Sequence, residues 1–395
     1  FIDNLIHTEC PFRCANINGA PGVGKSLMAM SFIKESGRNF YIIRRSKHDG
    51  AFINEIKSVF SKAAQNAPSI ILLDDMDKFV VEDKSKEEYV AIQACIDEVS
   101  SSDVYVIATA NSTHDIPSSL LRAGRFDRKI RVYPPRGNDA VRIIRHYLES
   151  KSIISDVNFD DVAKMLIGRS CAELETIINE AAIYAGYERK EKITMEHLVR
   201  SVLRIEYGVS NSVLTADALR LEKIAYHEAG HVVVSEVLDP DGVGLASLHA
   251  RDKAEQSGFV IRCSDWLVPM HNILMLLAGK ASTELKYGKV DEFASKDVMR
   301  GIEEITIGVV TNGICGISAL NVFDDYENPS DMLRAKQECI IQAELERYML
   351  KAKEIIAHNH EFVEAVATAL IEKNILLNSD IRMIRNRFNI VKAAI

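Results

Sequence analysis

Two histidines and a glutamate make up the most specific chemical pattern in this 395-residue chain, in the run His227-Glu228-Ala229-Gly230-His231. Residues i and i+4 lie on the same face of a helix, so both imidazoles can bind one metal ion. A catalytic zinc ion takes three protein ligands, and Glu228 can then act as the general base on a water. The spacing therefore predicts a hydrolytic zinc site on a helix.

The third ligand must come from farther along the chain, usually as His, Asp or Glu. The downstream acidic candidates are Glu284, Asp291, Glu292 and Asp297. Gly230, inside the same predicted helix, costs about 1 kcal/mol of helix stability relative to alanine. We expect another part of the chain to approach the helix closely there.

A glycine-rich stretch near the start of the chain, Gly19-Ala20-Pro21-Gly22-Val23-Gly24-Lys25-Ser26, has the pattern of a phosphate-binding loop. Its backbone N–H groups can surround phosphates, Lys25 can reach the β- and γ-phosphates, and Ser26 can hold Mg²⁺. The pattern predicts an ATP site. Its expected nucleotide-binding residues are Gly19, Pro21, Gly22, Val23, Gly24, Lys25, Ser26, Leu27 and Asp74.

The other groups of this site follow two apolar runs. Asp74 ends the run 70–73 and is placed to bind Mg²⁺, while Asn111 follows the run 104–108 and is suited to orient a water near the γ-phosphate. Arg122 and Arg125 can stabilise charge on a transferring phosphate of a neighbouring subunit. Solvated surface charge is the alternative interpretation of these two arginines.

These residues require elements that hold them in place. Apolar runs at 15–18, 40–43, 70–73 and 104–108 alternate with helical patterns at 26–35, 51–65 and 87–99. Such alternation predicts a parallel sheet covered on both faces. Helical periodicity continues from 139 to 204, and the polar stretch 208–212 is a linker candidate.

Beyond the linker the chain is predicted to be mainly helical, with a β-like segment at 257–262 and two long amphipathic helices around 343–356 and 362–371. The expected fold is multidomain. An α/β nucleotide domain (1–133) precedes a helical lid (134–207) and a mainly α-helical zinc metallopeptidase domain (208–395).

Composition excludes several classes of protein. The net charge of −8 offers no basic surface, which argues against nucleic acid as a partner. No run approaches the ~18 apolar residues of a membrane-spanning helix. Seven scattered cysteines favour reduced thiols in a reducing compartment. The chain begins with Phe and shows no signal peptide, so we expect a fragment, with any membrane anchor upstream of it.

Together these motifs resemble AAA+ ATPases and, with Ala225-Tyr226 before the first zinc-site histidine, the FtsH family of ATP-dependent zinc proteases. The resemblance implies a homo- or hetero-hexameric ring in which Arg122 and Arg125 reach the neighbour's nucleotide. It also implies a lid around 168–174 that contacts the nucleotide. The full-length protein would be membrane-anchored, with this portion in the cytoplasm, an organelle matrix or the stroma.

The resemblance also selects the third zinc ligand. The stretch Phe293–Asp297 is similar to the family segment that supplies an aspartate, so Asp297 is the expected ligand and Glu284 the runner-up. Residues 257–260 resemble the edge strand of the family's active site. Such an edge can pair with an extended peptide through main-chain hydrogen bonds.

Two departures from the family pattern bear on ATP hydrolysis and substrate threading. Asp75 stands where the family has the Glu that polarises the attacking water, and a misplacement near 1 Å can cost ~100-fold in rate. The substrate-gripping loop is shortened, which leaves His48 or Phe52 as the pore residue. Packing of Phe52 in the core is the alternative.

The sequence thus predicts an ATP-dependent zinc endopeptidase that unfolds, translocates and degrades proteins, with Zn²⁺, ATP and Mg²⁺ as cofactors. Its expected catalytic residues are Glu228, Asp75, Asn111, Arg122 and Arg125, and its metal ligands are His227, His231 and Asp297. One alternative is a nucleotide-binding zinc peptidase with weak or no ATP hydrolysis. The other is a protein-remodelling chaperone with an idle protease site.

Overall fold

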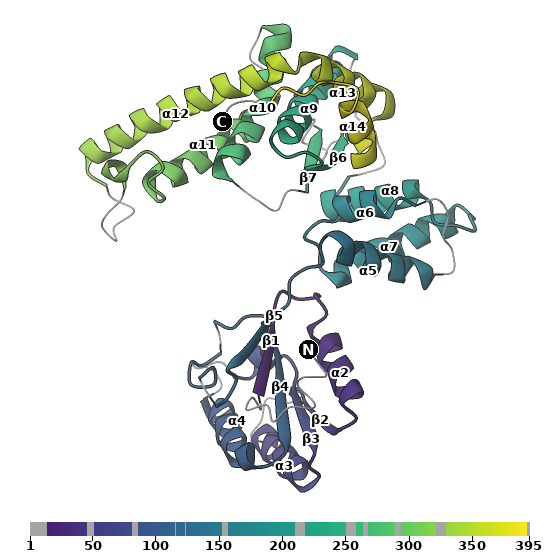
Figure 1. The fold of residues 1–395 in the computed structure, drawn as a ribbon, viewed down its shortest axis with the longest axis vertical. Helices are drawn as coiled ribbons and strands as arrows, with labels where there is room; N and C mark the ends of the chain where they lie inside the picture. Colours follow the sequence, from purple (N-terminus) through teal and green to yellow (C-terminus); the bar gives the residue numbers. More distant parts are fainter. Residues whose placement is uncertain are drawn as a thin grey trace. The chain divides into compact units, whose positions relative to one another are not determined.

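A computed structural model describes residues 14–45, 51–80, 86–114, 116–122, 124–151, 157–209, 218–249, 258–263, 268–288, 294–320 and 329–392. The chain divides into two compact units (Figure 1). The first comprises Phe1–Asp139 with Gly168–Thr176, and the second Ala140–Ile167 with Ile177–Ile395. No helix among the described residues is long and apolar enough to cross a membrane.

The first unit is built on a five-stranded parallel sheet with strand order β2-β3-β4-β1-β5. Its strands are β1 (Cys14–Asn18), β2 (Asn39–Ile43), β3 (Ser69–Leu73), β4 (Val104–Ala110) and β5 (Arg128–Arg131). The connecting helices are α2 (Lys25–Ser36), α3 (Ala51–Gln65) and α4 (Lys86–Glu98), with short 3₁₀ turns η1 (Met76–Lys78) and η2 (Val99–Ser101). The predicted α/β sheet is confirmed.

Alternation along β3 explains why helices cover both faces of this sheet. All five β3 residues are buried, because successive side chains point to opposite faces and each face has its own helical cover. Ile70 and Leu72 pack with α2, whereas Ile71 and Leu73 pack with α3 and α4. Figure 1 shows α2 across the sheet from α3 and α4. Because the strands pair in parallel, their carboxyl ends lie at the same edge of the sheet.

Four helices follow β5 in the region predicted as the lid: α5 (Gly137–Glu149), α6 (Phe159–Met165), α7 (Cys171–Tyr187) and α8 (Met195–Tyr207). Asn158 caps α6 by accepting hydrogen bonds from the Asp160 and Asp161 N–H groups, as expected for an Asn at this position. The start of α7 groups with the first unit and the rest with the second. The domain limits at 133/134 and 207/208 stay predictions.

The remainder of the second unit is mainly helical around a small antiparallel sheet with strand order β7-β6-β8. Its helices are α9 (Ala218–Leu238), α10 (Pro269–Tyr287), α11 (Ser295–Val310), α12 (Asp331–His358), α13 (His360–Lys373) and α14 (Asn378–Arg385), with the short turn η4 (Ile317–Ala319). Its strands are β6 (Val243–Ser247), β7 (Phe259–Arg262) and β8 (Ile375–Leu377). Every residue from Ile224 to Val237 is buried, so α9 is the central helix.

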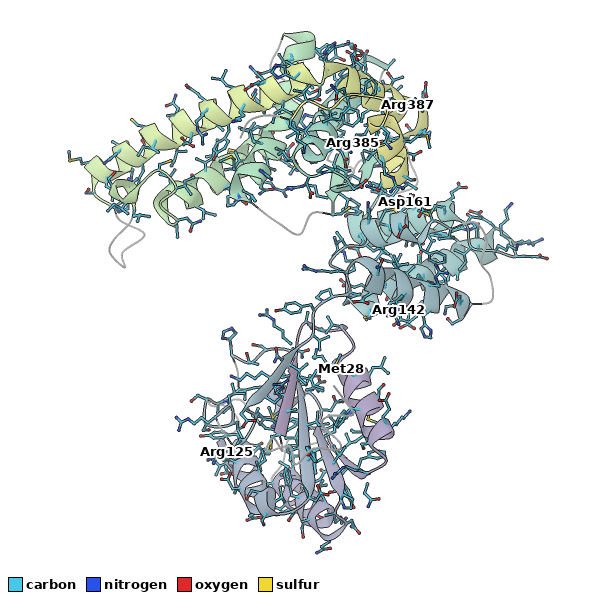
Figure 2. The ribbon with its side chains drawn as sticks, in the orientation of Figure 1. Met28, Arg125, Arg142, Asp161, Arg385 and Arg387 are labelled. Carbon is cyan, nitrogen blue, oxygen red and sulfur yellow. The ribbon has the colours of Figure 1, made fainter. Side chains whose placement is uncertain are left out.

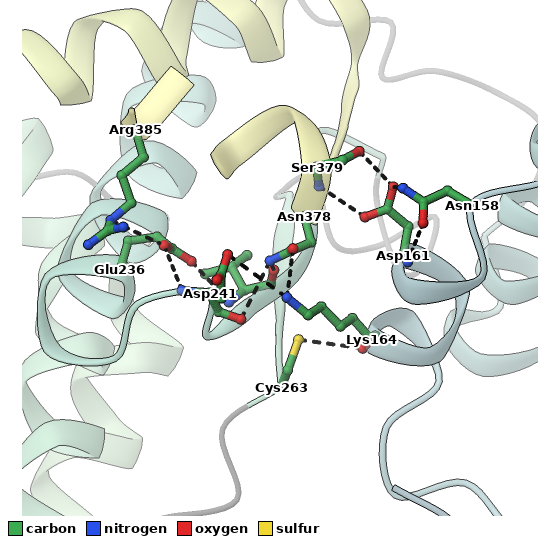
Figure 3. A network of polar contacts seen from close by, with 10 residues as sticks. Asn158, Asp161, Lys164, Glu236, Asp241, Cys263, Asn378, Ser379 and Arg385 are labelled. Atoms are coloured by element: carbon green, nitrogen blue, oxygen red, sulfur yellow. Dashed lines mark hydrogen bonds and ion pairs between the residues drawn. The ribbon is translucent and has the colours of Figure 1, made fainter. Parts of the chain in front are cut away.

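A polar network joins α6 to β6 and α14 within the second unit (Figure 3). The buried Asp161 carboxylate accepts hydrogen bonds from the Ser379 N–H at 2.9 Å and the Ser379 hydroxyl at 2.6 Å. Lys164 Nζ donates to Asn378 Oδ1 at 2.7 Å. A Cβ on Gly244 would lie 2.6 Å from the Lys164 carbonyl oxygen, so glycine is needed for this close approach.

Candidate metal centre and nucleotide site

The histidine pair lies on α9, inside the second unit. His227 and His231 are 3% and 6% exposed, and Glu228 between them is 2% exposed. The two Nε2 atoms are 3.1 Å apart. A helix spacing of four residues thus places both imidazoles at one point, as the sequence predicted.

Asp297, in the first turn of α11, completes this group. Its Oδ2 lies 3.1 Å from His227 Nε2 and 3.4 Å from His231 Nε2. One possible ligand atom from each of the three residues falls within 4.8 Å of the others. Glu284 is instead paired with Lys280 at 2.7 Å and Lys353 at 2.8 Å. Asp291 and Glu292 lie outside the described residues.

The electrostatics of the group favour a charged carboxylate. Burial alone would raise the pKa of Asp297, but hydrogen bonds and charge from the two histidines outweigh it and lower that pKa. Burial would likewise lower the pKa of His231, but Asp297 outweighs it and raises that pKa to about 9. His231 Nδ1 lies 2.7 Å from the Met275 carbonyl oxygen, which fixes the orientation of its ring.

Glycines let α10 and the strand β7 approach these side chains. A Cβ on Gly279 would lie 2.5–2.6 Å from ring atoms of His227 and His231. A Cβ on Gly230 would lie 2.5 Å from the Ala278 carbonyl oxygen, which confirms the expected close approach at that position. A Cβ on Gly258 would lie 2.7 Å from Glu228 Cγ, so the residue that precedes β7 lies against the glutamate side chain.

These observations fit a bound zinc ion. Two imidazole nitrogens and one carboxylate oxygen form the donor set that catalytic zinc sites use, with room left for a fourth ligand. The three groups come from two helices, α9 and α11, that each contact α10. His227, His231 and Asp297 are therefore suited to hold the zinc ion that the sequence implies.

The phosphate loop lies between β1 and α2 in the first unit. Gly22 and Gly24 have φ values of 77° and 95°, which side chains rarely adopt. Lys25 is 6% exposed, and its Nζ donates to the carbonyl oxygens of Gly19 and Ala20 and, at 2.8 Å, to Asn111 Oδ1. Burial lowers the pKa of Lys25. Leu27 is 72% exposed on α2.

Asp74 lies at the carboxyl end of β3, beside the phosphate loop. Its Oδ1 accepts hydrogen bonds from the hydroxyls of Ser26 and Thr109, both at 2.7 Å. Its Oδ2 accepts from Arg44. Burial raises the pKa of Asp74, but hydrogen bonds from these three residues outweigh burial and lower it. Thr109 and Arg44 are neighbours that the sequence reasoning did not identify.

Asp75 adopts an unusual conformation, with φ 56°. Its N–H donates to the Thr109 hydroxyl at 2.9 Å, and its carboxylate pairs with Lys78 at 2.6 Å. Asn111 is held between Lys25 and Asp77, whose Oδ2 accepts from the Asn111 N–H at 2.9 Å. Asp77 was also missed, although it follows Asp74 at a spacing of three residues.

The contacts given for Arg125, one of the two predicted arginines, are with residues outside the phosphate loop. Arg125, labelled in Figure 2, binds both carboxylate oxygens of Asp97 at 3.0 and 2.8 Å and the Ser119 carbonyl oxygen at 2.8 Å. Arg122 is exposed. The expected action of both arginines on a neighbouring subunit's nucleotide stays a prediction.

The start of α7 contacts the phosphate loop, in the segment where the lid was expected to reach the nucleotide. The Ala172 N–H donates to the Gly22 carbonyl oxygen at 3.1 Å, and Cys171 Sγ lies 3.7 Å from the Val23 carbonyl oxygen. A Cβ on Gly22 would lie 2.8 Å from Ser170 Oγ. The segment 170–172 is therefore placed against the loop that would hold phosphates.

The interpretation of Phe52 as a pore aromatic is wrong. Phe52 is 1% exposed on α3, and its ring packs edge-on against Phe79 with centroids 5.4 Å apart. The amphipathic pattern of α3 directs this position toward the sheet, as the alternative interpretation held. His48 lies outside the described residues.

Two known protein families match the part of the chain that carries the phosphate loop and the helices after it. Residues 16–134 match the model of the ATPase family associated with various cellular activities (AAA), and residues 156–200 match the AAA+ lid domain. With the parallel sheet, the phosphate loop and the helical lid, these matches define an AAA+ nucleotide module. The mainly helical unit with the histidine pair follows it.

Curated relatives extend the match into the histidine-bearing unit. The ATP-dependent zinc metalloprotease FtsH of Helicobacter pylori (strain 26695) is 26% identical over 94% of this chain and 64% of its own length. FtsH 2 of Thermoanaerobacter sp. (strain X514) is 27% identical, covering 92% and 74%. FtsH of Thermotoga maritima is 27% identical, covering 90% and 60%.

Over most of its length the chain is therefore similar to ATP-dependent zinc metalloproteases named FtsH, and these matches support its recognition as an FtsH-like AAA+ protein. It spans less than two thirds of the length of the Helicobacter relatives. At 26–27% identity the similarity is distant.

Proposed function

We propose that this protein is an ATP-dependent zinc endopeptidase that unfolds, translocates and degrades proteins as a six-subunit ring. The observation that carries the proposal is the convergence of His227, His231 and Asp297, next to the buried Glu228, in a chain that also has a phosphate loop. Two buried imidazoles and a carboxylate that meet at one point form the donor set of a catalytic zinc site.

The peptidase residues have distinct roles in this proposal. His227, His231 and Asp297 hold Zn²⁺, which when bound supplies Lewis-acid chemistry for peptide hydrolysis. Glu228 takes the proton of the attacking water as general base. Strand β7 lies at the edge of its sheet, and a substrate peptide in extended form pairs with that edge.

The nucleotide residues supply the mechanical work. Lys25 and the loop amides bind the phosphates of ATP, Ser26 and Asp74 hold Mg²⁺, and Asn111 positions water. Arg122 and Arg125 act on the neighbouring subunit's nucleotide. Arg125 can leave Asp97 and bind a phosphate at a small cost in free energy, because its ion pair with Asp97 is partly exposed. A membrane anchor upstream of residue 1 and a reducing compartment stay predictions.

A second candidate is a zinc peptidase whose AAA+ module binds ATP but hydrolyses it weakly. Asp75 favours it, because its side chain is one methylene shorter than Glu, its backbone has φ 56° and its carboxylate is paired with Lys78. A remodelling chaperone with an idle protease site gains no support, since all four peptidase residues are present.

The test combines three readouts on the wild-type protein and on Glu228→Gln. Metal analysis should find zinc in both proteins, because Glu228 is not a ligand. Cleavage of an unfolded protein should occur only in the wild type, and ATP turnover should persist in both. Wild-type protein without zinc or without cleavage contradicts the peptidase, whereas cleavage without ATP turnover favours the second candidate.

A further inference from the structure

The Mg²⁺-binding carboxylate of the nucleotide site already has a cation bound to it. Arg44 Nε and Nη2 each lie 2.7 Å from Asp74 Oδ2. The other oxygen, Oδ1, accepts from the Ser26 and Thr109 hydroxyls. Asp74 is 7% exposed at its side chain, so both oxygens are engaged by protein donors and little of the carboxylate meets solvent.

The sheet fixes this contact in place. Strands β2 and β3 pair in parallel, with Ile43 opposite Leu73, and the Asp74 N–H donates to the Ile43 carbonyl oxygen at 3.0 Å. Arg44, the residue after Ile43, must therefore lie beside Asp74. The next residue is directed elsewhere, because Arg45 Nη1 donates to the Lys78 carbonyl oxygen at 3.0 Å.

The charges around the phosphate loop are balanced without a metal ion. Asp74 is paired with Arg44, and Asp75 with Lys78. The negative charge of Asp77 also attracts the Lys25 ammonium, so three acidic groups lie near three basic ones. A divalent cation added to such a site gains less than it would beside unpaired carboxylates, because the guanidinium repels it. An arginine stays charged at every ordinary pH, so pH does not remove this competitor.

We propose that Arg44 competes with Mg²⁺ for Asp74, so that ATP binding by this chain depends only weakly on Mg²⁺. The inference rests on the proposed nucleotide site. Mg²⁺ requires an octahedral shell of oxygens, usually with several waters. Arg44 covers Asp74 Oδ2, and the Ser26 and Thr109 hydroxyls engage Oδ1, so Mg²⁺ must displace a protein donor to bind this carboxylate. Arg44 is 61% exposed, so its side chain has room to leave Asp74 when the metal concentration is high.

The experiment measures the affinity for ATP by calorimetry, with excess EDTA and at a series of Mg²⁺ concentrations. The wild type should bind ATP with affinities that differ by less than about threefold between the two extremes. In Arg44→Gln the same change should strengthen binding about tenfold, and half-saturation should need several-fold less Mg²⁺. Mg²⁺ binding to free ATP is the same in all samples, so differences between variants report the protein.

Arg45→Gln is the matched control, because it removes a neighbouring charge and leaves the Asp74 contact in place. It should respond to Mg²⁺ as the wild type does. Equal Mg²⁺ dependence in Arg44→Gln and the wild type would overturn the inference, even where both bind ATP. Wild-type protein that binds no ATP with or without Mg²⁺ would overturn the nucleotide site itself. Arg44→Lys, which keeps the charge with one donor group, should lie between the two.

Discussion

Gly279 is the position where one added methyl group should disturb the metal centre most directly. It lies within α10, and a Cβ built there would be 2.5 Å from His227 Cε1, 2.6 Å from His227 Nε2 and 2.6 Å from His231 Nε2. Ordinary contact begins near 3.4 Å. Gly279→Ala therefore requires both rings, which are nearly fully buried, to move by about 0.8 Å or more.

The magnitude follows from two opposing effects. Alanine improves helix propensity over glycine by about 1 kcal/mol, whereas overpacking a closed site costs about 1–3 kcal/mol. Gly301 on α11 isolates the first effect, because a Cβ there would make ordinary contacts with Leu277, at 3.6 Å from Cδ2 and 3.8 Å from Cγ. Gly279→Ala should thus be about 1–3 kcal/mol less stable than Gly301→Ala in metal-free protein, since the helix term is shared.

Zinc binding should change in the same direction. Displaced groups around metal ligands typically cost about 10–100-fold in metal affinity, and here the ligands themselves are displaced. The assay is zinc titration against a competing chelator, with thermal unfolding of the EDTA-treated proteins measured alongside. Wild-type zinc affinity in Gly279→Ala would refute the reasoning. Gly301→Ala must keep wild-type affinity, or the comparison reports helix effects.

Three further substitutions test the metal centre, the nucleotide site and the polar network between α6 and α14. Asp297→Asn should lower bound zinc, because an amide lacks the charge of a carboxylate ligand; full occupancy there, with loss in Glu284→Gln, would transfer the ligand role to Glu284. Asp75→Glu should raise steady-state ATP turnover with little change in ATP affinity, since this carboxylate acts on the transition state; an unchanged or slower rate would mean that the backbone at φ 56° is adapted to Asp. Asp161→Ala should lower the free energy of unfolding by about 1–3 kcal/mol, because the Ser379 N–H and hydroxyl lose their acceptor. Substitution of the exposed Asp160 by Ala should lower it by less than about 1 kcal/mol. Equal unfolding midpoints for the two variants would show that the polar network does not stabilise the protein.

The sequence predicted the elements with strong periodicity and lost those without it. Strands β2 to β4 are largely apolar and lie between helices, and α3 was predicted with its observed limits of 51 and 65. β5 was missed because Arg128–Arg131 is a charged, largely exposed edge strand whose pairing with β1 determines its conformation. β8 was missed because three residues between two helices carry no measurable period.

For the candidate sites, too, local sequence patterns predicted best the residues that lie close together in the chain. The residues of compact motifs came together as expected, because spacing on one helix or one loop determines where they lie. Arg44 and Thr109 meet Asp74 through the lateral pairing of strands, which local sequence does not encode. Asp77, three residues after Asp74, was a local signal that could have been used. The helical Gly279 was a signal that could have been used, since a glycine inside a helix often marks close packing.

The central claim is that ATP hydrolysis at one site drives proteolysis at the other. The direct measurement is degradation of a folded, tagged protein with ATP, compared in the wild type, Lys25→Ala and Glu228→Gln. We predict loss of the intact substrate and release of peptides by the wild type with ATP, and by neither variant. Lys25→Ala should still cleave short unstructured peptides, because its zinc ligands are unchanged. Degradation of the folded substrate by Lys25→Ala at the wild-type rate would contradict the claim.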